Sequence, residues 1–142
     1  MITMKRKNKG FTLLEIIIVV IIVGVLASLA LPRLFSTVEY SRSTEALAAI
    51  GTVRSSMERC LLKSGSGNYN GCTSFATQLD IPDPGTEAGH HFTYGIAGNG
   101  TIGYTITATR NTLDGGVATH TVLLTKDATN VTKSGTTAFS KL

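Results

Sequence analysis

The long apolar run near the start of the chain constrains its fold more than any other feature. The run extends from Phe11 to Leu31 and reads FTLLEIIIVVIIVGVLASLAL. Its only polar side chains are those of Thr12, Glu15 and Ser28. Coiled as an α-helix, such a run measures roughly 30 Å, which is the thickness of the hydrocarbon core of a bilayer. We therefore expect residues 11–32 to form a membrane-spanning helix.

A short basic leader comes before this run. Four of the 13 basic residues lie in residues 1–10, which hold no acid, so the remaining nine equal the nine acids of the chain. The four are Lys5, Arg6, Lys7 and Lys9. Basic flanks stay on the cytoplasmic side, so we expect the chain after Leu31 to lie beyond the inner membrane. A small secreted binding domain with an ordinary signal peptide is an alternative, because Ala27, Ser28 and Ala30 imitate a cleavage site.

Glu15 is the one acid within the apolar run. A carboxylate at the bilayer centre costs about 2.5–3.5 kcal/mol on insertion scales, and less near the interface where Glu15 lies. In one interpretation its side chain simply reaches the headgroup layer. In the other, cleavage just before Phe11 creates an α-amino group that pairs with Glu15 of a neighbouring copy of the chain. Such a pair would fix the axial register between the two copies.

The residues around Glu15 resemble a known processing signal. Residues 9–15, KGFTLLE, resemble the cleavage and N-methylation motif of type IV prepilins and of type II secretion pseudopilins. The resemblance implies that a prepilin peptidase cuts after Gly10 and methylates the amine of Phe11. It also implies that Glu15 neutralises the amino terminus of the neighbouring subunit during assembly. The specific similarity covers residues 5–32.

The same resemblance implies partners and locations. The chain is expected to be a single-pass inner-membrane protein with a cytoplasmic N-terminus before assembly, in contact with the lipid bilayer and with an inner-membrane assembly platform. After assembly it is expected in a homo-oligomeric helical filament, either a surface pilus or a periplasmic pseudopilus. A pilus would serve adhesion, motility or DNA uptake, and a pseudopilus would serve type II protein secretion.

Gly24 and Pro32 mark the least stable part of the apolar helix. Proline removes one helical hydrogen bond and clashes with the preceding turn, and glycine weakens a helix entropically. The resemblance implies that residues 24–32 unwind locally in assembled fibres. Many relatives carry a second proline about twenty residues further on, where this chain has Thr52. The second half of the helix is therefore expected to be straighter.

Apolar residues become periodic after Pro32, which predicts an amphipathic continuation of the helix over residues 33–63. The apolar stripe is formed by Leu34, Val38, Ala46, Leu47, Ile50, Val53, Met57 and Leu61. The stripe suits burial under the chain's own domain better than a coiled coil with a partner. We expect the charged residues beside it to be solvated, namely Arg42, Glu45, Arg54, Glu58 and Arg59.

Cys60 and Cys72 are the only cysteines, and the segment between them is rich in glycine and serine. If the domain lies in an oxidising compartment, a disulfide between them would stabilise it by about 3 kcal/mol. Two free thiols are the alternative. A zinc site is disfavoured, because two cysteines without a histidine at ligand spacing cannot complete a tetrahedron.

The rest of the chain predicts a small β-rich head in an α+β fold, a long N-terminal helix packed on an antiparallel sheet. Residues 64–91 are rich in glycine, serine, asparagine and proline and predict a loop region. Residues 92–142 are expected to form the sheet. Strands are predicted at 92–97, 102–109 and 117–125, with short turns that favour an antiparallel meander. The polar residues 129–142 suit either an edge strand or a frayed tail.

Neither an enzyme nor a metal site is expected. His90, His91 and His120 are the only side chains that ordinarily titrate near neutrality, and no catalytic triad, P-loop or dinucleotide fingerprint accompanies them. Asp127 and Asn130 offer too few oxygen ligands for calcium. Basic residues outside the leader are interleaved with acids, so no nucleic-acid site is evident. We therefore expect no cofactor.

Overall fold

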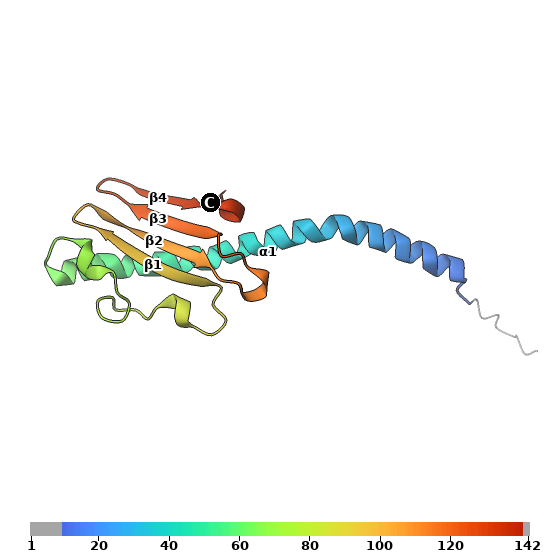
Figure 1. Ribbon diagram of the computed structural model, residues 1–142, viewed down its shortest axis with the longest axis horizontal. Helices are drawn as coiled ribbons and strands as arrows, with labels where there is room; N and C mark the ends of the chain where they lie inside the picture. Colours follow the sequence, from blue (N-terminus) through green and yellow to red (C-terminus); the bar gives the residue numbers. More distant parts are fainter. Residues whose placement is uncertain (1–9, 141–142) are drawn as a thin grey trace, which may run out of the picture. The chain divides into compact units, whose positions relative to one another are not determined.

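In a computed structural model, the chain is described over residues 10–140. Residues 1–9 of the expected leader and the last two residues of the expected tail lie outside the described residues. Figure 1 shows one long helix, α1, followed by a sheet of four strands. The regular elements after α1 (Leu13–Ser64) are η1 (Tyr69–Cys72), η2 (Pro84–Thr86), β1 (Phe92–Asn99), β2 (Gly103–Arg110), η3 (Leu113–Gly115), β3 (Thr121–Lys126), β4 (Val131–Gly135) and η4 (Thr137–Phe139).

The four strands form an antiparallel meander in the order β1-β2-β3-β4. Ile106 of β2 lies opposite Ile96 of β1 on one side and Leu124 of β3 on the other. The turn between β1 and β2 places Gly100 at a φ of 61°, a conformation that glycine adopts without steric cost. The expected α+β fold, a long helix with a small antiparallel sheet, is confirmed.

The third strand begins later than the sequence predicted. β3 starts at Thr121, whereas the expected strand began at Val117. The backbone N–H of His120 donates to the carbonyl oxygen of Val117 at 2.9 Å, so these residues form a turn after η3 instead of extending. β4 pairs with β3, so residues 131–135 are an edge strand, a question that the sequence left open.

The chain divides into two compact units, residues 1–36 and residues 37–142. In the first unit, α1 continues without interruption through Gly24 and Pro32. The expected unwinding of residues 24–32 concerns the assembled fibre and stays a prediction. Among the described residues, α1 is the only helix long and apolar enough to cross a membrane, judged by length and composition.

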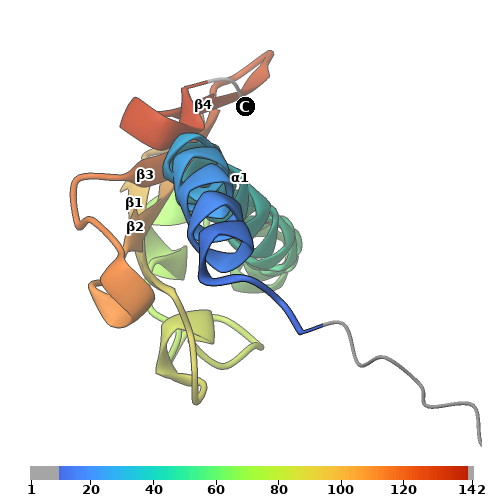
Figure 2. The ribbon, with the colours of Figure 1, turned by 90° about the vertical axis from the view of Figure 1, so that its right-hand side faces the viewer.

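The core of the second unit lies between the sheet and the part of α1 after residue 37, as the two views in Figures 1 and 2 agree. Ala46, Ile50, Val53 and Met57 recur every three or four residues, so they share one face of the helix and are buried. The sheet and the C-terminal η4 contribute Phe92, Tyr104, Ile106, Ala108, Val122, Leu124 and Phe139. Burying one large apolar side chain contributes roughly 1.5–3 kcal/mol, so this layer stabilises the unit.

The opposite face of the sheet carries no charged side chain. Side chains alternate between the two faces of a strand, so the residues between the core positions point outward. The register aligns them in rows that run across the strands. Apart from Gly95, the central rows consist of Thr93, Ala97, Thr105, Thr107, Thr109, Thr121, Leu123, Thr125, Thr132 and Ser134.

The segment between α1 and β1 flanks the β1 edge of the sheet (Figures 1 and 2). A disulfide joins Cys60 of α1 to Cys72 of η1, which confirms the expected bridge. The N–H of Tyr69 donates to the carbonyl oxygen of Gly100 at 2.9 Å, and the N–H of Gly100 donates to Oδ1 of Asn70 at 3.0 Å. The bridge therefore ties η1 to α1, and the two hydrogen bonds tie it to the turn between β1 and β2.

Candidate functional site

The start of α1 is a capping box formed by Thr12 and Glu15. The backbone N–H and the hydroxyl of Thr12 donate to Oε2 of Glu15 at 3.0 and 2.9 Å. In return, the N–H of Glu15 donates to the hydroxyl oxygen of Thr12 at 3.2 Å. These reciprocal bonds satisfy backbone donors that the first turn of a helix otherwise leaves without partners.

The capping box gives Glu15 a local role that the sequence analysis missed. The partners expected for the carboxylate were the headgroup layer or the amino group of a neighbouring copy, but its hydrogen-bond donors in the structure belong to Thr12 of the same chain. The signal was present, because Thr-x-x-Glu before an apolar run is the usual sequence pattern of a capping box. Both contacts end on Oε2, so among the described residues no hydrogen-bond donor is recorded for Oε1.

The apolar side chains that follow the capping box are exposed. Exposed fractions run from 83% at Phe11 to 46% at Ile17, and no residue of the most apolar stretch of α1 is buried. A continuous apolar surface of this kind marks contact with a membrane or with other proteins. The segment thus combines a polar capping box at its start with a long exposed apolar surface. The apolar surface suits insertion into a bilayer, and the polar start can form contacts when helices pack.

Gly10 and Phe11, the residues on either side of the expected cleavage point, are both exposed. A Cβ atom at position 10 would meet nothing within 4 Å among the described residues, so the backbone is unobstructed in that direction. Such an open backbone suits entry into a peptidase active site, and cleavage itself stays a prediction. The basic residues of the leader lie outside the described residues.

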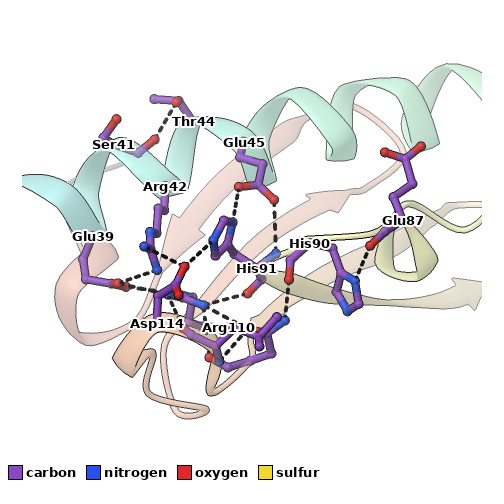
Figure 3. A network of polar contacts seen from close by, with 12 residues as sticks. Glu39, Ser41, Arg42, Thr44, Glu45, Glu87, His90, His91, Arg110 and Asp114 are labelled. Atoms are coloured by element: carbon purple, nitrogen blue, oxygen red, sulfur yellow. Dashed lines mark hydrogen bonds and ion pairs between the residues drawn. The ribbon is translucent and has the colours of Figure 1, made fainter.

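A second polar site lies in the head, centred on Arg110 (Figure 3). The guanidinium is fully buried and donates to both carboxylate oxygens of Glu39 in α1, at 3.2 and 3.1 Å. It also donates to the backbone carbonyl oxygens of His91, Asn111 and Leu113 at 3.0–3.1 Å. All of its nitrogens are thereby used to join the helix to the end of the β1–β2 pair where β1 begins and β2 ends.

Beside this site, His91 lies between two carboxylates. Its Nδ1 is 2.9 Å from Oε2 of Glu45 in α1, and its Nε2 is 3.1 Å from Oδ2 of Asp114 in η3. Arg42 donates to the same Oδ2 of Asp114 at 3.2 Å. Glu45 is exposed, as expected, but the prediction that Arg42 is solvated was wrong, because only 19% of its side chain is exposed. Loops distant in sequence bring charged partners to this side of the helix.

A third cluster joins the other end of α1 to the sheet. Glu58 accepts hydrogen bonds from Lys126 at 2.8 Å, from Tyr104 at 3.0 Å and from Tyr69 at 2.9 Å. Burial raises the pKa of Glu58, but these three donors together bring that pKa below its ordinary value. Nearby, Arg59 pairs with Asp80 at 2.7 Å. Glu58 and Arg59 were both expected to be solvated. Arg59 is exposed, as expected, whereas Glu58 is partly buried against Tyr69 and Tyr104.

The described residues offer no group of three or more histidine, cysteine or acidic side chains arranged to hold a metal ion. His90 and His120 do not join His91 in one cluster. The Nδ1 of His90 lies 2.6 Å from the carbonyl oxygen of Glu87, and the ring of His120 packs against Phe139 with centroids 5.6 Å apart.

Comparison with known proteins finds similarity concentrated in the first half of the chain. The family described as the prokaryotic N-terminal methylation motif matches residues 5–31. The type IV major fimbrial protein FimA of Dichelobacter nodosus is 38% identical over 73 residues, which cover 50% of this chain and 47% of that protein.

Two further relatives carry names from different assemblies, one from a type II secretion system and one from a fimbria. The type II secretion system core protein G of Dickeya chrysanthemi is 42% identical over 55 residues, covering 39% of this chain and 35% of that protein. A fimbrial protein of Pseudomonas aeruginosa is 33% identical over 76 residues, covering 54% and 49%. The chain spans about half the length, or less, of these curated relatives.

Proposed function

Because this chain belongs to the family of type IV pilins and type II secretion pseudopilins, whose members are structural subunits and not enzymes, we propose that it is the major subunit of a type IV pilus. The observation that carries the proposal is the exposed apolar segment of α1 with a single acid, Glu15, at its start. This combination suits a helix that first lies in a bilayer and later packs against copies of itself.

Helix packing supplies the driving force for this transfer. Lipid tails are as apolar as the side chains from Phe11 to Leu31, so moving the helix from lipid into a bundle gains little from the hydrophobic effect. The gain comes from close packing between helices and from polar contacts that form only in the bundle. Glu15 supplies such a contact.

The capping box prepares Glu15 for that contact. Oε2 accepts both hydrogen bonds from Thr12, which leaves Oε1 to receive the α-amino group of Phe11 from a neighbouring subunit. The carboxylate keeps local donors while the subunit waits in the membrane, which lowers the cost of holding it there. Docking then adds a cation, and the pairing sets the axial register between subunits.

Processing and location follow from the same proposal. A prepilin peptidase removes the leader by cutting after Gly10, and it methylates the new terminus at Phe11. The subunit waits in the inner membrane with its head on the far side, and an assembly platform inserts it into the growing fibre. The assembled filament serves adhesion, motility or DNA uptake at the cell surface.

Mass spectrometry of the mature protein tests the processing step, with N-methylated Phe11 as the expected first residue. A mature chain that starts after Ala30 would instead identify a secreted domain and overturn the proposal. The assembly step is tested with Glu15→Ala, which should insert into the membrane normally but enter no fibres. Ser28→Ala is the matched control, because the Ser28 hydroxyl only donates to Val25 of its own helix at 2.7 Å. Wild-type fibre yield from Glu15→Ala would refute the pairing.

The second candidate is a pseudopilin, favoured by the 42% identity to a type II secretion core protein. It would use the same helix in a short periplasmic fibre that drives protein secretion. Electron microscopy of sheared cells separates the two candidates. Long surface fibres that contain this chain support a pilus, whereas loss of exoprotein secretion in a deletion strain without such fibres supports a pseudopilus.

A further inference from the structure

His91 bridges three segments of the head through both of its ring nitrogens (Figure 3). Nδ1 faces Glu45 of α1 at 2.9 Å, and Nε2 faces Asp114 of η3 at 3.1 Å. The backbone N–H of His91 also donates to Oε1 of Glu45 at 3.3 Å, and its carbonyl oxygen accepts from Arg110. The imidazole is mostly buried, with 24% of its side-chain surface exposed.

This geometry depends on the protonation state of the imidazole. A carboxylate oxygen without a proton can only accept a hydrogen bond, so each of the two contacts needs an N–H on the ring. Neutral histidine carries one N–H, and its other nitrogen presents a lone pair. Only the imidazolium donates to Glu45 and Asp114 at once, and it does so with charge-assisted bonds.

Two arginines lie beside this group of side chains. From α1, Arg42 contacts Asp114 at 3.2 Å and Glu39 at 3.6 Å. From β2, Arg110 is paired with Glu39. The hydrogen bond from His91, with the charge of Arg42, lowers the pKa of Asp114 below its ordinary value. Other titratable groups near His91 are Glu87, His90 and Tyr94, which line the same pocket, and Asp83, whose charge acts on Tyr94.

We propose that His91, Glu45 and Asp114 form a proton-dependent latch that fastens α1 to the β1–β2 side of the head. The latch is closed when the imidazole is protonated and both carboxylates receive a proton donor. It opens partly when the ring is neutral, because one carboxylate then faces a lone pair. The Asp114 contact opens more easily, because this side chain is 63% exposed and is carried by a short turn in which Asp114 has a φ of 51°.

The direction of the pH effect follows from the proton count. A neutral imidazole weakens the latch. The latch therefore stabilises the head fully at pH values where His91 is protonated, and this stabilisation is lost as the pH rises and the ring loses its proton. Between about pH 5.5 and 8 the charge of a histidine ordinarily changes while that of a carboxylate does not, so in this range the latch should respond through His91 and not through its acids. Losing one charge-assisted, partly exposed hydrogen bond should raise the unfolding equilibrium constant about tenfold.

The test is urea unfolding of the full chain in detergent micelles, followed by tyrosine fluorescence at about pH 5.5 and pH 8. His91→Gln is the test variant, because the amide side chain holds polar contacts but does not titrate. His90→Gln is the matched control, since the ring of His90 lies against the carbonyl oxygen of Glu87 and takes part in no ion pair among the described residues. Subtracting the pH response of His91→Gln from that of the wild type also removes the contribution of His120, whose buried Nδ1 has no hydrogen-bond partner among the described residues.

Between about pH 5.5 and pH 8, the folding equilibrium constant of the wild type and of His90→Gln should fall about tenfold more than that of His91→Gln. An equal pH response in all three proteins would overturn the latch. If His91→Gln does not fold, nitrogen-15 NMR of the wild-type ring decides the question. Protonation of both His91 nitrogens at pH 5.5 supports the proposal, and a single neutral tautomer at that pH refutes it.

Discussion

Replacing Arg110 by methionine is the perturbation that should destabilise the head most through a single polar side chain. Methionine approximates the length of the arginine side chain and is tolerated in cores, so the packing against Phe92 is largely kept. The hydrogen bonds are lost. Six donated contacts from the guanidinium to Glu39, His91, Asn111 and Leu113 would disappear together.

The magnitude follows from what remains behind. Arg110 is fully buried, whereas the side chain of Glu39 is 20% exposed. Removing one partner of a buried ion pair costs about 3–5 kcal/mol, because the other charge stays without compensation. Water reaches Glu39 in part, so we expect the lower end of that range, about 3 kcal/mol. A domain with a stability of about 5–15 kcal/mol would lose a large share of it.

Urea unfolding of the full chain in micelles, with tyrosine fluorescence as the signal, measures this loss as a shift of the midpoint. Arg110→Lys is the first control, because it keeps the charge but loses the bidentate contact with Glu39. Its stability should lie between those of the wild type and Arg110→Met. The double variant Arg110→Met with Glu39→Met is the second. It removes both charges and should recover part of the loss.

A loss below about 1 kcal/mol for Arg110→Met would refute this reasoning, because surface ion pairs contribute no more than that. The same conclusion would follow if the double variant were as unstable as the sum of the two single variants. Additive losses mean that the two side chains do not interact.

Three further predictions concern the rest of the head. Replacing Cys60 and Cys72 by serine should cost about 2–5 kcal/mol of stability and make η1 accessible to proteases, as limited proteolysis would reveal; an unchanged digestion pattern would contradict this. Gly103→Ala should prevent normal folding, because the new methyl group would lie 1.7 Å from the carbonyl oxygen of Lys126. In Gly95→Ala the methyl group meets nothing within 4 Å, so this control variant should fold normally. Circular dichroism distinguishes the two outcomes. Glu58 has a lowered pKa, so its contribution is present above its ordinary value of 4.5 and is lost as pH falls through the lowered value. Glu58→Gln should therefore flatten the acid side of the stability profile, and an unchanged profile would contradict the role of its three donors.

The sequence predicted the elements whose signals are local. The apolar run, the three-four spacing from Ala46 to Met57 and the alternation in β2 each repeat within a short window, and each corresponds to an observed element. The start of β3 was missed because the turn at residues 117–120 depends on a hydrogen bond after η3, and Val117 looks like a strand residue on its own.

The polar network was not predicted because its partners lie far apart in the sequence. Glu39 and Arg110 are separated by 71 positions, and only the folded sheet brings them together. One signal was nevertheless available. The alternation of Tyr104, Ile106 and Ala108 continues to Arg110, which places a charge on the core face and demands an acid on the helix opposite.

The threonine-rich outer face of the sheet has a consequence for how copies of this protein meet. Its hydroxyl and methyl groups create no strong electric field, so nothing on that surface repels an identical neighbour or selects a partner by charge. Any association through it should change little between dilute and concentrated salt, whereas contacts that depend on exposed ion pairs weaken as salt is added.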